Sequence, residues 1–416
     1  MSSERKENPL SATALRCRNC ETDHALEAVG ICSRCWGPLD PVYDRGELAR
    51  TVTRASIAAG PPSLWRYAPL LPVEPPAEQR LAPGLTPLVR AARLEEQLGI
   101  GELWLKLDTA NPTHSFKDRV VAVATAKAQE LGLTTLACSS TGNLANAVAA
   151  RAAAEGLDAA VFCPADLEPE KLTPTAVFGA TLYAVDGTYD DCSRLTIELS
   201  FELPWAFVNV GLRSYYAEGS KTLAYEIAEQ LGWELPDVVV APIASGSLFT
   251  KVARGFEEFI EAGLLTGEIP TMCGAQAEGC SPVAQAFAAG SDVCRPVKPD
   301  TIAKSLAIGN PADGPYAVEL ANATGGVIES VNDDEIRAGV RLLAETTGIF
   351  TETAGGVTTA VLAKLAAAGK IDPDERVVAY ITGDGLKTLD VVRDTFTVTE
   401  IAPSLDEFES AFAAVA

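Results

Sequence analysis

The sequence predicts an α/β protein in which mainly parallel sheets are covered by helices on both faces. From about residue 85 onwards, short apolar segments alternate with amphipathic segments of helical length. One short segment, DVVVAPI, is apolar after its first residue, as strands buried on both faces are. The chain has 416 residues, of which 47% are hydrophobic, so it is long enough for two or three domains with a large core.

The charge balance and the apolar runs limit the possible partners. The chain carries 33 basic and 56 acidic residues, a formal charge of −23, which argues against a nucleic-acid partner. No apolar run reaches the roughly 18 residues that a membrane helix needs. The N-terminal MSSERKENPL lacks the apolar stretch of a secretory signal. We therefore expect a cytoplasmic protein with neither a nucleic-acid nor a membrane partner.

Residues 1–42 read as a separate small module. Two C-x2-C pairs supply its candidate metal ligands, which are Cys17, Cys20, Cys32 and Cys35. Such pairs suit tetrahedral coordination of zinc by thiolates, and a piece this short can hardly build a core without a metal. A ribbon that packs without metal remains the alternative. His24 is either a substitute ligand or a surface residue.

The rest of the chain can be assigned in order. Residues 43–84 are rich in proline and alanine and predict an extended linker, with Trp65 and Tyr67 as anchors on the surface that it wraps. The segments predicted as strands are LWLKLD, TTLACSS, AAVFCP, ATLYAVDG, WAFVNV, DVVVAPI, TMCGAQA and RVVAYITGDG. Helices are predicted at 118–131, 143–156 and about 248–262. Ligands of such sheets bind at the carboxyl ends of the strands.

Two loops at predicted strand ends have the composition of binding loops. SSTGN (139–143) follows TTLACSS, and ASGS (244–247) follows DVVVAPI; each opens a helix. Backbone N–H groups of the second loop, together with the helix N-terminus, can form a cradle for a phosphate group. The loop lacks a Walker lysine and the G-x-G-x-x-G spacing, which argues against a nucleoside triphosphate or a dinucleotide.

Lys117 stands where a helix begins, in NPTHSFKDR, an unfavourable place for a cation. A helix mouth lowers the pKa of the amine, and an amine near a phosphate cradle can form a Schiff base with a phosphorylated aldehyde, for which pyridoxal 5′-phosphate is the candidate. Asn143 is available for the 3′ oxygen of its ring, and the Thr382 hydroxyl, in TGDG, for the pyridine nitrogen. The alternative for Lys117 is an ordinary surface lysine in a first helical turn.

Five collinear segments resemble the fold-type II pyridoxal-phosphate enzymes, especially the threonine synthases. NPTHSFKDR resembles their lysine motif, SSTGNLANAVAARAAAEGL their substrate and ring-oxygen loop, and APIASGSLFTKVARGF their phosphate loop with its helix. TIAKSLAIGNPA and ITGDGLK resemble two further family segments. The resemblance covers about 85 to 387.

The resemblance implies a tryptophan synthase β-like fold of two parallel-rich α/β/α domains, and it implies a homodimer. The large, cofactor-binding domain would comprise 85–118 and 219–416, and the small domain 119–218. The zinc-ribbon-like module occurs in some members. Lys117 would bind the cofactor covalently, with Phe116 at the wall of its site. The cofactor phosphate would lie on Ala244, Ser245, Gly246, Ser247 and Leu248.

The implied reaction converts O-phospho-L-homoserine, a small amino-acid phosphate, and water into L-threonine and phosphate. Lys117 would remove the Cα and Cβ protons of the substrate. The candidate substrate contacts are His114, Ser140, Thr141, Asn146 and Arg213.

The sequence departs from the family pattern where the substrate is expected. His114 replaces a usual glycine and could carry a proton, bind phosphate or simply pack. Leu144 replaces a threonine, and Tyr216 stands at the position of the substrate-phosphate arginine, for which Arg213, one turn earlier, could substitute. A related enzyme, such as a cysteate synthase or a serine/threonine dehydratase, is therefore the alternative. A non-catalytic regulator or metal-binding scaffold is the alternative of another class, and the presence of Lys117 argues against it.

Overall fold

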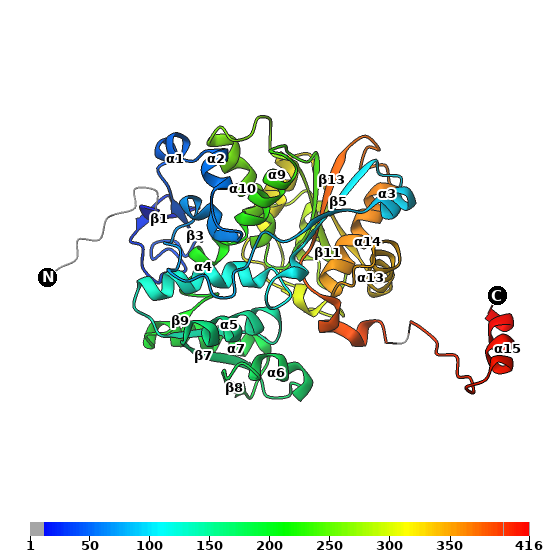
Figure 1. The fold of residues 1–416 in the computed structure, drawn as a ribbon. Helices are drawn as coiled ribbons and strands as arrows, with labels where there is room; N and C mark the ends of the chain where they lie inside the picture. The colour runs from blue at the N-terminus through cyan, green and yellow to red at the C-terminus, as the bar shows by residue number, and fades with distance from the viewer. Residues whose placement is uncertain (1–11, 394, 416) are drawn as a thin grey trace.

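The computed structural model describes residues 12–393 and 395–415 (Figure 1), so the first part of the predicted module lies outside the described residues. From residue 12 on, the module forms a three-stranded antiparallel sheet in the order β2-β1-β3. Its strands are β1 (Ala14–Cys17), β2 (Asp23–His24) and β3 (Leu39–Val42). Within the described residues, no helix is both long and apolar enough to cross a membrane.

The larger sheet has the strand order β12-β11-β10-β13-β5-β4. Its members are β4 (Leu88–Arg90), β5 (Glu102–Leu107), β10 (Val238–Pro242), β11 (Thr271–Ala277), β12 (Ile328–Val331) and β13 (Arg376–Ile381). All neighbours run parallel except β4, which pairs antiparallel with β5 at the edge. Alternate residues of β10 face opposite layers. Val239 packs with the core around α9 (Lys221–Gln230) and α10 (Ser247–Glu261), and Val240 packs with the core around α14 (Thr353–Ala367).

The smaller sheet is fully parallel, in the order β8-β7-β6-β9. Its strands are β6 (Thr135–Ser139), β7 (Asp158–Pro164), β8 (Thr181–Val185) and β9 (Ala206–Phe207). Leu136 faces α4 (Lys117–Glu130) and α5 (Asn143–Glu155), and Ala137 faces the opposite side with α7 (Tyr189–Glu202). Both sheets confirm the α/β class. They fix no boundary between domains, so the predicted division at 118/119 and 218/219 stays a prediction.

The helices surround these sheets as Figure 1 shows. They are α1 (Arg45–Thr51), α2 (Arg54–Ala58), α3 (Ala92–Leu98), α4 (Lys117–Glu130), α5 (Asn143–Glu155), α6 (Pro169–Ala176), α7 (Tyr189–Glu202), α8 (Arg213–Glu218), α9 (Lys221–Gln230), α10 (Ser247–Glu261), α11 (Pro282–Ala288), α12 (Gly314–Ala323), α13 (Asp333–Thr347), α14 (Thr353–Ala367) and α15 (Leu405–Val415). The 3-10 helices are η1 (Leu64–Leu70), η2 (Asp108–Ala110), η3 (Lys304–Leu306) and η4 (Gly385–Val391).

Two local predictions need correction. The segment 43–84 is not simply extended, because it contains α1, α2 and η1; Asp44 caps α1 and Thr53 forms a capping box on α2. Trp65 and Tyr67 are buried, as expected of anchors. The strand predicted from WAFVNV is only the two-residue β9, because the chain turns directly after it, with the amide of Val210 donating to the carbonyl of Phe207.

The C-terminal arm after η4 leaves the body of the molecule and ends in α15, which lies apart from both sheets (Figure 1). Phe408 and Phe412 stack on each other on this helix, with ring centroids 5.9 Å apart. Both side chains are exposed, since the chain's own body does not cover them.

A buried ion cluster joins the helix that carries Lys117 to the larger sheet. Arg119, fully buried in α4, donates from Nε to Asp108 Oδ2 at 2.7 Å, directly after β5, and it also pairs with Glu226 of α9. Lys106 of β5 reaches the same Glu226 carboxylate at 2.7 Å. Burial of these charges is tolerated because each one has an opposite partner.

We predict that Arg119→Met strongly destabilises the fold, because it leaves Asp108 and Glu226 buried with too little positive charge. The expected loss is about 3–5 kcal/mol of unfolding free energy, measured by urea denaturation. Arg341→Met is the control, since Arg341 pairs with Glu345 on an exposed helix face and should change the unfolding free energy by less than about 0.5 kcal/mol. Equal midpoints for the two variants would contradict this role of Arg119.

Candidate active site

Lys117 is the first residue of α4, and its amine lies among aromatic side chains. Nζ donates a hydrogen bond to the Tyr216 hydroxyl at 2.8 Å and lies 4.5 Å from the centroid of the Phe116 ring. Burial lowers the pKa of the amine to about 8, opposed by the nearby Glu352 carboxylate. The predicted depression of the pKa is confirmed, but its main cause is desolvation rather than the helix mouth.

The loop before Lys117 is fixed against the loop after β13. Ser115 forms an isolated bridge with Gly383, and the amide of Phe116 donates to the carbonyl of Thr382 at 2.9 Å. Thr382 is buried. The structure therefore brings together the predicted lysine, its aromatic neighbour and the predicted partner of the pyridine nitrogen.

His114 has a backbone φ of +61°, in the left-handed region that favours glycine. Its side chain is exposed, and Nδ1 lies 3.2 Å from the carbonyl oxygen of Thr109. The backbone carbonyl of His114 accepts from the amide of Asp384 at 3.1 Å. The imidazole ring therefore forms its hydrogen bond with the Thr109 carbonyl and not with the amine of Lys117, although His114 and Lys117 are close in sequence.

Asn143, the first residue of α5, links the two sheets. Its Nδ2 lies 2.9 and 3.0 Å from the two carboxylate oxygens of Glu352, and its Oδ1 accepts from Lys387 Nζ at 2.7 Å. Lys387 also donates to the carbonyl of Thr113 at 2.6 Å. Burial raises the pKa of Glu352. Neither Glu352 nor Lys387 was predicted from the sequence as a site residue. Lys387 could have been predicted, because it is the last residue of the family-like segment ITGDGLK.

The loop 244–248 leaves the same edge of the larger sheet as Thr382, because β10 and β13 are parallel neighbours. Gly246 has a φ of +93°, and α10 begins at the next residue. A Cβ at Gly246 would lie 2.7 Å from the carbonyl oxygen of Asp313, so only glycine fits this loop in its observed form. A glycine-containing loop at a helix N-terminus matches the predicted phosphate cradle.

The candidate substrate residues lie on two other segments. Ser140 and Thr141 precede α5, and the Ser140 hydroxyl accepts from the amide of Gly142 at 3.3 Å. Asn146 Oδ1 accepts from the Thr175 hydroxyl of α6 at 2.7 Å. Arg213 opens α8 and pairs with Asp313 at 2.5 Å.

Tyr216, one turn after Arg213, contacts the amine of Lys117. Tyr216 stands at the position of the family arginine, and the sequence predicted no role for this tyrosine in the site. Its contact with the amine depends on the packing of α8 against α4, which no local motif reports.

Together these residues fit a phosphorylated aldehyde such as pyridoxal phosphate. The amine of Lys117 has a lowered pKa, which a Schiff-base lysine needs. The loop 244–248 offers backbone amides at the start of a 15-residue helix. The Asn143 amide can donate to a ring oxygen once it is released from Glu352.

The four cysteines of the N-terminal module form one compact cluster. Their sulfur atoms all lie within 4.8 Å of one another, with separations of 3.4 Å for Cys17–Cys35, 3.7 Å for Cys20–Cys32 and 3.3 Å for Cys20–Cys35. Thiolates around a tetrahedral zinc ion lie about 3.8 Å apart. The cluster is therefore compatible with a structural zinc site. His24 Nε2 lies 3.3 Å from Cys32 Sγ, as a hydrogen-bond partner of a ligand does.

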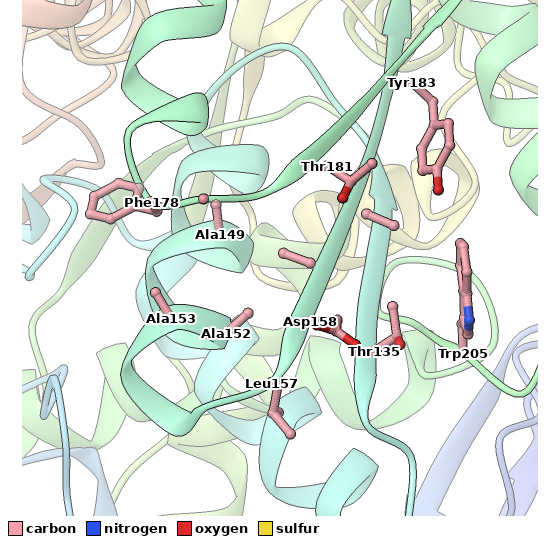
Figure 2. A pocket seen from close by; sticks show the side chains of 13 residues that line it. Thr135, Ala149, Ala152, Ala153, Leu157, Asp158, Phe178, Thr181, Tyr183 and Trp205 are labelled. Carbon is pink, nitrogen blue, oxygen red and sulfur yellow. The ribbon is translucent and has the colours of Figure 1, made fainter.

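A pocket of about 350 Å³ lies elsewhere, at the amino-terminal side of the smaller sheet. Figure 2 shows alanines of α5 beside Thr135, Asp158 and Thr181, which begin β6, β7 and β8. The loop 140–142 follows the opposite end of β6, so this pocket is separate from the residues around Lys117.

Comparison with known proteins agrees with this geometry. Residues 80–383 match the family described as pyridoxal-phosphate dependent enzyme. The chain is 37% identical to threonine synthase of Methanocaldococcus jannaschii over 378 residues, 90% of this chain and 93% of that one. It is 37% identical to threonine synthase of Methanosarcina acetivorans over 383 residues, 91% and 93% of the two chains.

Solved structures share the fold at lower identity. Processed threonine deaminase isoform 2 from Solanum lycopersicum superposes with a TM-score of 0.61 at 22% identity, covering 74% of this chain and 87% of that one. An L-serine ammonia-lyase from Rhizomucor miehei gives a TM-score of 0.63 at 21% identity, covering 76% and 99%.

We predict about one zinc ion per purified chain, because four thiolates satisfy one tetrahedral ion. The double variant Cys17→Ser, Cys20→Ser should lose it, as measured by elemental analysis. Cys273→Ser is the control, since Cys273 lies buried in the larger sheet, outside the cluster. A wild-type chain that folds stably without metal would contradict the assignment.

We predict that Lys117 reacts as a neutral amine at lower pH than an exposed lysine. Because its pKa is lowered to about 8, the neutral fraction should rise with pH, reach one half near pH 8 and approach its plateau at about pH 9.5. Reductive methylation of the cofactor-free chain, read by peptide mass spectrometry, measures this rate, and the exposed Lys298 is the internal reference. A rate at Lys117 that follows Lys298 across pH 7–10 would count against the burial effect.

Proposed function

Because the chain belongs to the threonine synthases, within the fold-type II pyridoxal-phosphate dependent enzymes, we propose that it converts O-phospho-L-homoserine and water into L-threonine and phosphate. The chain is then a lyase of threonine biosynthesis that acts on a small-molecule substrate. The observation that carries the proposal is the buried amine of Lys117, whose pKa is lowered to about 8, beside the strand ends from which the phosphate loop and Thr382 emerge.

We assign the cofactor contacts as the sequence predicts. Lys117 would hold pyridoxal phosphate covalently, and Phe116 would form part of the wall beside its ring. Backbone amides of the loop from Ala244 to Leu248 would receive the phosphate group. Asn143 would donate to the ring oxygen, and the Thr382 hydroxyl would serve the pyridine nitrogen. Bound pyridoxal phosphate supplies an electron sink that makes the Cα and Cβ protons of the substrate removable.

Lys117 is the proposed acid and base of the reaction. An amine with a pKa near 8 exists in both forms at neutral pH, so it can take protons from Cα and Cβ and return them later. Phosphate leaves from Cγ with the electrons of the broken C–O bond, Cγ takes up the proton that Cβ lost, and the hydroxyl of water adds at Cβ while the remaining proton goes to the phosphate. The hydrogen bond to Tyr216 holds the amine in one orientation. Since the His114 ring bonds to Thr109, we assign it no part in this proton transfer.

The remaining residues are proposed to hold the substrate. Ser140 and Thr141, together with the N-terminus of α5, can bind the carboxylate, and the Asn146 amide lies one turn further on. Arg213 is the proposed partner of the substrate phosphate, because a guanidinium binds phosphate with two parallel hydrogen bonds. Tyr216 has taken the position of the family arginine and contacts Lys117 instead.

We also propose that the enzyme is a cytoplasmic homodimer. No disulfide joins any of the ten cysteines, which suits a reducing compartment. The exposed Phe408 and Phe412 on the C-terminal arm supply apolar surface that a second copy could cover.

We predict that the purified chain with pyridoxal phosphate releases phosphate from O-phospho-L-homoserine and forms threonine in equal amount. Lys117→Ala should reduce turnover by several orders of magnitude and abolish the visible absorption band of the bound cofactor. Lys298→Ala, an exposed lysine, is the matched control and should retain both. Phosphate release from O-phosphoserine with sulfite, without reaction of phosphohomoserine, would instead identify a cysteate synthase. Ammonia release from serine or threonine would identify a dehydratase.

A further inference from the structure

Asp313, directly before α12, touches three separate parts of the molecule. It is buried, with 1% of its surface exposed. Its carboxylate accepts from Arg213 of α8 at 2.5 Å and from Arg18 of the N-terminal module at 3.3 Å. Its amide donates to the carbonyl of Ser245 at 2.8 Å, and its own carbonyl lies where a Cβ on Gly246 would collide. One residue therefore contacts the phosphate loop, the proposed phosphate arginine and the cysteine module.

A second set of ion pairs holds the same elements from the other side. Asp40 of β3 pairs with Arg18 at 2.6 Å and with Lys251 of α10 at 2.8 Å. Lys251 also pairs with Glu218 of α8 at 2.5 Å. The module is thus tied to the helix whose N-terminus carries the phosphate loop and to the helix that carries Arg213.

The position of Arg18 depends on the metal cluster of the module. Arg18 follows the candidate ligand Cys17 directly, and its amide donates to the carbonyl of Pro38 within the module. When four thiolates hold one ion, the turn that begins at Cys17 is fixed, and the Arg18 side chain is directed at Asp313. Loss of the ion would release this turn.

The shared carboxylate also sets the charge that Arg213 presents. Arg18, which also pairs with Asp40, competes with Arg213 for the Asp313 carboxylate, so Arg213 keeps more of its positive charge for a phosphate oxygen. Without Arg18, Asp313 would pair with Arg213 alone and hold it more strongly. Without the Arg18 pair, Asp313 would also be held less firmly against the loop at Gly246.

We propose that Asp313 is a positioning residue for both phosphate sites and that the cysteine module acts on the active site through the chain Arg18–Asp313–Arg213. The module then sets the affinity for the phosphate groups of cofactor and substrate rather than only stabilising the fold. The substrate part of this inference rests on the proposed threonine synthase function. The cofactor part requires only pyridoxal phosphate.

Arg18→Gln tests this chain, and Arg16→Gln is its matched control. Arg16 lies two residues earlier in the same module and pairs with Asp23 on the surface, at 2.7 Å, without reaching the body. The first readout is the Kd of pyridoxal phosphate, from absorbance titration of the full chain after removal of the cofactor. The second is the KM of O-phospho-L-homoserine, set against kcat. Urea midpoints report stability.

Arg18→Gln should raise the Kd and the KM by about tenfold, a size typical of coupling between two sites, with little change in kcat. Arg16→Gln should leave both constants within about twofold of wild type, because it breaks only an exposed pair. Equal Kd and KM values for the two variants would overturn the proposal. So would weaker binding by Arg18→Gln that is restored when added osmolyte returns its urea midpoint to that of the wild type.

Removal of the metal tests the link between the module and the active site in the wild-type chain, so this test does not depend on whether a variant folds. Chelation of the wild-type chain should weaken pyridoxal phosphate binding about as much as Arg18→Gln does, and chelation of Arg18→Gln should add little, because both act through one contact. An unchanged Kd after chelation would refute the link. The titration uses no substrate, so it separates this inference from the proposed function. A wild type that binds pyridoxal phosphate but leaves phosphohomoserine intact would contradict only the latter.

Discussion

The position of the Lys117 amine depends on the burial of one guanidinium group. Arg119 is enclosed between Asp108, at the end of β5, and Glu226 of α9, and it lies two residues after Lys117 on α4. Because the guanidinium group must reach both buried carboxylates, these two ion pairs fix the rotation of α4 about its axis and its distance from the larger sheet. Gly219 reinforces this fit, because a Cβ there would lie 2.7 Å from the carbonyl oxygen of Arg119. The amine of Lys117 is thereby placed at the junction of the two sheets.

The site is assembled from both sheets. The larger sheet supplies the loop 244–248, Thr382 and Glu352, and the smaller sheet supplies Asn143 through the loop after β6. Lys387 connects the halves by donating to Asn143 and to the carbonyl of Thr113. Because parallel strands end at a common edge, residues far apart in sequence meet there without long connecting loops.

Much of the fold and part of the site were predictable from the sequence. Alternating apolar and amphipathic segments identified the α/β class, and local motifs identified Lys117, the loop 244–247 and the cysteine pairs. The contacts that could not be predicted join distant residues: Asn143 with Glu352, and Arg18 with Asp313. No periodicity reports such pairs, since they depend on how layers pack. The short helices α1 and α2 were missed because their caps, Asp44 and Thr53, outweigh a composition typical of linkers.

The C-terminal arm holds α15 apart from the body of the molecule. In Figure 1, α15 lies well apart from both sheets, and every residue assigned to the site precedes the arm. A fluorescent reporter or a surface linker attached to α15 would consequently be carried at a distance from Lys117. The protein is thus suited to immobilisation through this helix, with the loops around Lys117 kept away from the support.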